Sequence, residues 1–184
     1  MNLPTKITVA RIVMIPVFIA VFFIDAIPYN RFIATAVFML ASLTDFLDGY
    51  LARKNNLVTN LGKFLDPIAD KMLVSCALIA IALEPTFLQI AVAVFSMVIL
   101  CRELMISGFR IVASSKNVIL AADKLGKIKT TLQMIALILL LPYADIAALS
   151  DQAGDIVCYI GFAFLALATV MTVVSGLNYI DKNK

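Results

Sequence analysis

The chain has 184 residues, of which 62% are hydrophobic and 15% charged; its mean hydropathy is +1.01 and its formal net charge +3. Soluble domains are about 45–50% apolar, so this composition excludes an ordinary soluble protein and is typical of an integral membrane protein. The sequence contains no histidine, which excludes catalytic triads built on histidine and most zinc sites. Any metal or acid–base chemistry must therefore use carboxylates, which favour magnesium, manganese or calcium.

Uncharged apolar runs predict an all-α integral membrane protein with six transmembrane helices. In chain order the runs cover residues 12–24, 32–44, 72–83, 86–101, 130–144 and 156–180. Only the last run exceeds the roughly 20 residues that cross a bilayer core. Several helices must therefore continue into charged sequence at one end, where we expect the functional residues. We also expect a single membrane domain over residues 1–184, with a short interfacial segment around Pro4 before the first span.

The basic residues predict how these helices are oriented. If the N-terminus is cytoplasmic, 14 of the 15 basic residues fall on the cytoplasmic side, and only Arg31 lies in an outer loop. This distribution follows the positive-inside rule, so we expect both termini in the cytoplasm. Pro28, Pro85 and Pro142 are typical of the three outer turns.

The stretch LTDFLDGYLARKNNLVTNLGKFLDPIADKML, residues 43–73, places four aspartates between two apolar runs. Asp45 and Asp48 are three residues apart, and Asp66 and Asp70 are four apart. On a helix, both spacings put the paired carboxylates on one face, roughly 4.5 and 6 Å apart along the axis. One or two divalent cations would offset their repulsion, and oxygen ligands suit Mg²⁺ or Mn²⁺. The alternative is a solvated cluster of helix-end charges, paired with Arg53, Lys63 and Lys71.

Small residues accompany the aspartates. Gly49 and Ala52 share the helix face of Asp45, where they would allow either a bulky ligand or a second helix to approach the backbone. These two interpretations are equally favoured by the residues alone. We expect Gly62 at the end of the connecting loop and Pro67 in the first turn of the third helix.

The order D-x2-D-G-x2-A-R-x8-G-x3-D-x3-D, which runs from Asp45 to Asp70, resembles the signature of the CDP-alcohol phosphotransferase family. Eight positions match in identity and spacing over 26 residues. The resemblance implies a six-helix membrane enzyme, usually dimeric, that transfers a phosphatidyl or related group from a CDP-linked donor to an alcohol and releases CMP. It also implies three sets of roles. The metal ligands would be Asp45, Asp48, Asp66 and Asp70. The donor-binding residues would be Asp48, Gly49, Ala52, Arg53 and Gly62. The general base on the attacking hydroxyl would be Asp70.

Basic residues at the ends of later helices suggest which alcohol is the acceptor. We expect an anion pocket for an acceptor that carries a phosphate group, formed by Arg102, Arg110, Lys127 and Lys129. Glu103 is an acid at a membrane-helix end and needs a partner. The alternative for these cations is ordinary positive-inside charge in contact with lipid headgroups, which we prefer for Lys116 and Lys124.

The segments NLPTKITVARI, REL…SGFR and GKIKT resemble the bacterial branch of this family that makes phosphatidylglycerophosphate. Thr5 departs from the asparagine usual there, which puts any ligand role of that position in doubt. The resemblance implies CDP-diacylglycerol and sn-glycerol 3-phosphate as substrates, a homodimer in the bacterial inner membrane with its active site facing the cytoplasm, and no nucleic-acid partner.

Two other functions remain open. The same chemistry could use another acceptor: inositol phosphate fits the charge equally well, serine fits it poorly, and phosphatidylglycerol is a third possibility. A cation transporter or channel would also place carboxylates in a membrane protein. However, the aspartates cluster at one face of the membrane, and neither an inverted repeat nor a broken helix is evident.

Overall fold

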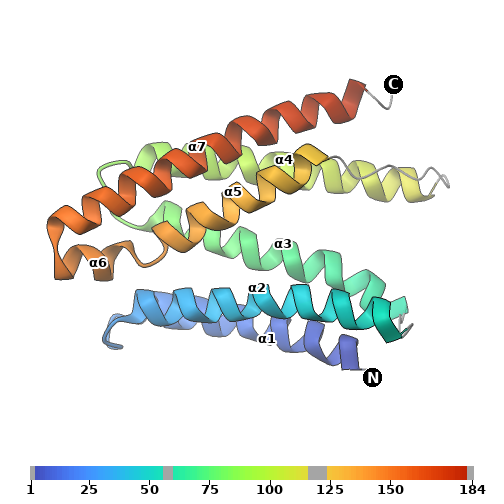
Figure 1. The fold of residues 1–184 in the computed structure, drawn as a ribbon, viewed down its shortest axis with the longest axis horizontal. Coiled ribbons are helices and arrows are strands. Elements are labelled where there is room, and N and C mark those ends of the chain that lie inside the picture. The colour runs from blue at the N-terminus through green and yellow to red at the C-terminus, as the bar shows by residue number, and fades with distance from the viewer. Residues whose placement is uncertain (1–2, 56–59, 116–123, 182–184) are drawn as a thin grey trace. The chain divides into compact units, whose positions relative to one another are not determined.

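The computed structural model describes the backbone of residues 3–55, 60–115 and 124–181, and the side chains of residues 8–44, 68–109, 113 and 125–178. These parts of the chain form seven helices and no strand (Figure 1). The helices are α1 (Leu3–Phe23), α2 (Asn30–Asn55), α3 (Asn60–Leu83), α4 (Gln89–Ser115), α5 (Lys124–Leu140), α6 (Tyr143–Leu149) and α7 (Asp151–Asp181). The all-α fold predicted from the apolar runs is therefore confirmed.

The helices belong to two compact units. The first contains Met1–Ala80 with Leu141–Gly154, and therefore α1, α2, most of α3, and α6. The second contains Ile81–Leu140 with Asp155–Lys184, and therefore α4, α5 and most of α7. The four aspartates belong to the first unit, and the basic residues expected to bind the acceptor belong to the second.

Two helical segments within the described residues are long and apolar enough to cross a membrane, Gln89–Phe109 and Asp151–Asn178. A third span is formed if Leu125–Leu140 and Tyr143–Leu149, which are bent by 41°, count together. Shorter apolar helices cover Thr8–Phe23 and Asn30–Thr44. A helical membrane protein is thus supported, and the full set of six spans stays a prediction.

The expectation that helices continue into charged sequence is confirmed at the aspartate segment. α2 runs past the apolar residues to Asn55, and α3 begins at Asn60. The predicted positions of Gly62 and Pro67 were wrong, because α3 begins before both of them. Gly62 therefore lies in the first turn of α3. Pro67 lies inside α3, where a membrane helix tolerates the loss of one backbone hydrogen bond. The segment around Pro4 is part of the continuous helix α1.

Aromatic side chains fill the core between α1 and α2, which pack against each other. Phe18, Phe22 and Phe38 are fully buried. The ring centroid of Phe18 lies 5.9 Å from that of Phe22 and 6.1 Å from that of Phe38. Such tilted pairs add to the stabilisation that comes from burying their apolar area.

The turn between α1 and α2 is held by the residues that follow it. Tyr29 has a φ of 55°, and the chain reverses there. Asn30 Nδ2 donates to the carbonyl oxygens of Phe22 and Ile24, at 3.1 and 3.3 Å. Arg31 donates to the same Phe22 carbonyl and lies over the Phe22 ring, 4.2 Å from its centroid. The Phe22 carbonyl in the last turn of α1, which has no partner within the helix, is satisfied in this way.

α6 contacts the beginning of α2 within the same unit. The backbone N–H of Phe32 donates to Asp145 Oδ2 at 2.8 Å. A carboxylate at the first turn of a helix satisfies a free N–H and interacts favourably with the helix dipole. Asp145 therefore links α6 to α2.

In the second unit, α7 packs closely against its neighbours. The rings of Phe95 on α4 and Phe162 on α7 stack with centroids 5.3 Å apart. Gly161 on α7 faces Leu140 on α5 so closely that a Cβ at this position would lie 2.7 Å from the Leu140 side chain. Small residues at such points allow membrane helices to approach each other.

Candidate functional site

The aspartate segment lies on two continuous helices. α2 carries Asp45 and Asp48, and α3 carries Asp66 and Asp70. Because both stretches are helical, each pair of aspartates shares a helix face. Asp70 is exposed, and the side chains of the other three lie outside the described residues. The helical backbone therefore agrees with the spacing on which the predicted pairs depend.

The residues expected to bind the donor lie on the same two helices. Gly49, Ala52 and Arg53 follow Asp48 on α2, and Gly62 is in the first turn of α3. Their side chains also lie outside the described residues. Only four residues separate Asn55 from Asn60, so the facing ends of α2 and α3 lie at most about 18 Å apart. In Figure 1 both helix ends lie at the same end of this unit.

The donor set of this segment fits a hard divalent cation. Four carboxylates on two neighbouring helix ends supply only oxygen ligands, and Mg²⁺ and Mn²⁺ prefer oxygen. Among the residues with described side chains, no group of three or more possible metal ligands occurs, but Asp45, Asp48 and Asp66 fall outside that set. The metal assignment therefore stays a prediction based on helix geometry and ligand chemistry.

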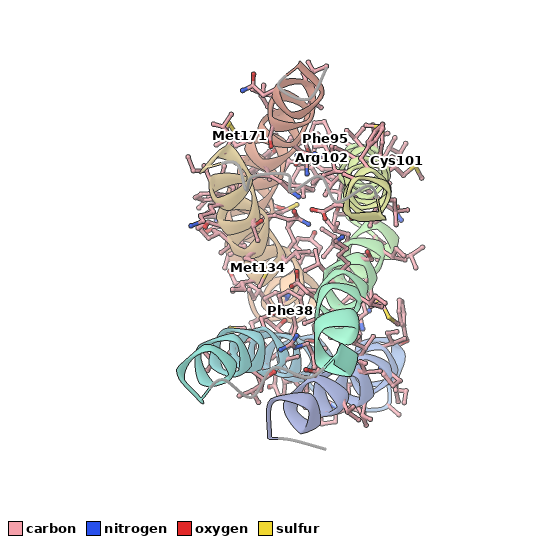
Figure 2. All side chains as sticks on the ribbon, turned by 90° about the vertical axis from the view of Figure 1, so that its right-hand side faces the viewer. Phe38, Phe95, Cys101, Arg102, Met134 and Met171 are labelled. Atoms are coloured by element: carbon pink, nitrogen blue, oxygen red, sulfur yellow. The ribbon has the colours of Figure 1, made fainter. Side chains whose placement is uncertain are left out.

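Arg102, the first of the four basic residues, points from α4 toward α7 (Figure 2). Its Nη2 donates to Ser175 Oγ at 2.8 Å. Arg110 lies two helical turns further along α4, and its side chain is outside the described residues. α4 thus carries both arginines, as the sequence predicts.

The two lysines of α5 have different surroundings. Lys129 is almost completely buried and forms an ion pair with Glu103 of α4, whereas Lys127 is exposed. Residues two apart on a helix are separated by about 200°, so both cannot face the same neighbour. The partner that Glu103 requires is therefore Lys129. The predicted pocket, in which all four cations converge beside the aspartates, joins residues of both units and stays a prediction.

Sequence reasoning gave no role to several buried polar residues. Ser175 is 1% exposed, Gln133 is 2% exposed, and Arg11 is fully buried. Arg11 is one of the basic residues from which the topology is predicted, although a charged residue is rarely buried completely unless it is paired. The only signal in the sequence was the isolation of each residue within an apolar helix, which does not identify its partner.

Comparison with known proteins gives a consistent result. The sequence profile of the CDP-alcohol phosphatidyltransferase family matches residues 1–174. A Bacillus subtilis protein named CDP-diacylglycerol–glycerol-3-phosphate 3-phosphatidyltransferase is 43% identical, covering 99% of this chain and 95% of its own. Proteins with the same name from Rickettsia bellii and Shigella flexneri serotype 5b are 40% and 35% identical, covering 97% and 98% of this chain and 93% of their own.

Proposed function

Because the chain belongs to the CDP-alcohol phosphatidyltransferase family, we propose that it transfers the phosphatidyl group of CDP-diacylglycerol to sn-glycerol 3-phosphate. The products are phosphatidylglycerophosphate and CMP. The observation that carries this proposal is the near full-length similarity to relatives that are named for this reaction. The presence of the complete aspartate pattern on two continuous helices supports it.

The residues of the aspartate segment form the part of the proposed site that binds the donor. Asp45, Asp48, Asp66 and Asp70 would hold Mg²⁺ or Mn²⁺, which when bound neutralises the charge of the diphosphate and of the departing CMP. Gly49 and Ala52, which lack bulk, allow the nucleotide to approach the α2 backbone, and Arg53 and Gly62 complete the donor site. This position at the membrane surface allows the acyl chains of the donor to stay in the bilayer.

The transfer step then requires an activated acceptor. An oxygen of the glycerol phosphate forms a bond to the phosphorus that carries diacylglycerol, and the bond from this phosphorus to the oxygen of CMP breaks. Asp70, exposed on α3, takes the proton of the attacking hydroxyl, because an alcohol is a weak nucleophile at neutral pH. CMP leaves with the electron pair of the broken bond.

The acceptor phosphate is assigned to the basic residues of the second unit. Arg102, Arg110 and Lys127 offer N–H donors suited to phosphate oxygens. Lys129 contributes positive charge next to this group and is itself neutralised in part by Glu103. These assignments rest on charge and on the position of the residues along α4 and α5.

The proposal includes a topology. Six spans with both termini in the cytoplasm would place the aspartates and the basic residues on the same side of the bacterial inner membrane. The chain would act as one membrane domain over residues 1–184 and as a homodimer. Reporter fusions after Ala26, Pro85 and Ser150 should report the outside of the cell, and fusions after Asn55 and Lys184 the cytoplasm. The opposite pattern would overturn the orientation.

CMP release from the purified protein tests the reaction. CDP-diacylglycerol and Mg²⁺ or Mn²⁺ are supplied with glycerol 3-phosphate, inositol phosphate, serine or phosphatidylglycerol in separate reactions, and the lipid product is identified by mass. We expect CMP and phosphatidylglycerophosphate with glycerol 3-phosphate alone. Release of CMP with inositol phosphate alone would overturn the assignment of glycerol 3-phosphate as the acceptor. If no acceptor gave CMP, the assignment as an enzyme would be overturned. Cation transport would then be measured in vesicles.

A further inference from the structure

Ser175 on α7 is an observed partner of Arg102, an arginine assigned above to the acceptor phosphate. The Ser175 hydroxyl oxygen accepts a hydrogen bond from Arg102 Nη2 at 2.8 Å, and Ser175 itself is 1% exposed. The bond joins residues 73 positions apart in the sequence. It therefore fixes the end of a long side chain of α4 to a buried point on a different helix.

The next residue of α7 gives the arginine room to reach this point. A Cβ at Gly176 would lie 3.5 Å from both Cγ and Nε of Arg102, so the arginine side chain runs directly along the α7 backbone. Figure 2 shows Arg102 directed from α4 toward α7. A large side chain at position 176 would occupy the space that the Arg102 side chain uses.

Ser175 differs from the neighbouring buried hydroxyls of α7. Thr169 and Thr172 donate to carbonyl oxygens of their own helix, those of Leu165 and Ala168, at 2.8 and 2.6 Å. These bonds satisfy a hydroxyl inside a membrane helix without any other partner. The Ser175 oxygen instead receives an N–H of a cation from another helix. Of these three hydroxyls, Ser175 alone contacts a residue of the proposed acceptor site.

We propose that Ser175, with Gly176, is a positioning residue that holds the Arg102 guanidinium in the orientation that binds the phosphate group of the acceptor. This inference rests on the proposed function. A guanidinium carries five N–H donors in a planar fork, so a bond from one of its nitrogens fixes the directions of the others. Holding the fork before the acceptor arrives lowers the entropy that binding must otherwise remove.

The variant Ser175→Ala tests this role by removing only the hydroxyl. We expect the KM for glycerol 3-phosphate to rise about 3- to 10-fold, with the KM for CDP-diacylglycerol unchanged and kcat nearly so. Inhibition by inorganic phosphate, used as a probe of the same pocket, should weaken by a similar factor. The conservative variant Ser175→Thr, which keeps a hydroxyl, should restore most of the affinity for the acceptor.

The matched controls are Thr172→Val and Thr169→Val, which each remove a buried hydroxyl from the same helix. Both should leave the acceptor KM at its wild-type value. A double variant tests whether Ser175 acts through the arginine. Adding Ser175→Ala to Arg102→Ala should raise the acceptor KM no further than Arg102→Ala alone, because interacting residues are not additive.

Gly176→Leu gives an independent test, since the added side chain displaces Arg102 without changing Ser175. It should raise the acceptor KM, while Ala163→Leu, an exposed change on the same helix, should not. Suppose that the wild-type protein releases CMP, but Ser175→Ala has the same acceptor KM as the threonine controls. The positioning role is then wrong, and the proposed function stands. If wild type releases no CMP with any acceptor, the proposed function itself fails.

Discussion

Lys129 on α5 forms an ion pair with Glu103 on α4, and the lysine side chain is only 4% exposed while that of the glutamate is 24% exposed. Glu103 directly follows Arg102, which bonds to Ser175 on α7. Adjacent residues of one helix point about 100° apart. Two consecutive residues of α4 therefore join it to two different helices. Together these contacts fix both the rotation of α4 about its axis and its position along that axis.

Removing either charge of this pair should destabilise the second unit. A buried charge that loses its partner typically costs about 3–5 kcal/mol, and the partial exposure of Glu103 places the expected loss toward the lower end of that range. Lys129→Met and Glu103→Gln should therefore each lower the thermal unfolding midpoint in detergent. The double variant should recover much of the loss, because no unpaired charge stays buried. Additive losses would contradict a direct pairing.

Asp70→Asn should abolish turnover and leave the fold intact. The substitution removes the proton acceptor and one proposed metal ligand while keeping the size of the side chain, and general-base loss alone costs about 10²- to 10⁴-fold. CMP release measures the effect, and elution from a sizing column checks that the protein is folded. The control is Asp151→Asn, an exposed aspartate in the first turn of α7. Substantial activity in Asp70→Asn would remove Asp70 as the base.

Gly154→Ala should destabilise the first unit. The added Cβ would lie 2.7 Å from Ala147 Cβ and 2.8 Å from Ala147 Cα, and a backbone atom cannot move aside as a side chain does. Overpacking of this kind costs about 1–3 kcal/mol. The matched control is Gly108→Ala, where no atom of the described residues, apart from the nearby backbone of α4 itself, lies within 4 Å of the added Cβ. The higher helix propensity of alanine should stabilise α4 by up to about 1 kcal/mol. If the unfolding midpoints of Gly154→Ala and Gly108→Ala moved in the same direction, the close contact between α6 and α7 would be contradicted.

Asp145→Ala should weaken the link between α6 and α2. The N–H of Phe32 loses its acceptor and the α2 dipole loses a nearby negative charge, for a cost of about 0.5–2 kcal/mol. Asp145→Asn keeps an oxygen acceptor and should show a smaller loss of stability. Asp155→Ala, an exposed change on α7, serves as the control. Hydrogen exchange at the Phe32 amide gives a local measurement, and unchanged protection there would exclude the capping role.

The local features of this protein could be predicted from the sequence, since they depend only on helical spacing. The extension of α2 and α3 through the aspartates follows from apolar runs too short to span a bilayer. The start of α3 could not be placed, because Gly62 and Pro67 suggested a later beginning. The side-chain contacts that join one helix to another could not be predicted either. Lys129 with Glu103 and Phe32 with Asp145 are separated by 26 and 113 residues, and their contacts depend on how the helices are placed in space.

The hydroxyls that bond to their own helix have a consequence for the order of assembly. Thr35, Ser42 and Thr172 donate to carbonyls of Arg31, Phe38 and Ala168, so these polar groups are satisfied as soon as each helix forms. These three hydroxyls therefore need no partner from another helix when their helix enters the bilayer. The pair of Glu103 with Lys129, in contrast, is completed only when α4 meets α5. A half-assembled protein would therefore carry unpaired charges within membrane helices, which is energetically costly.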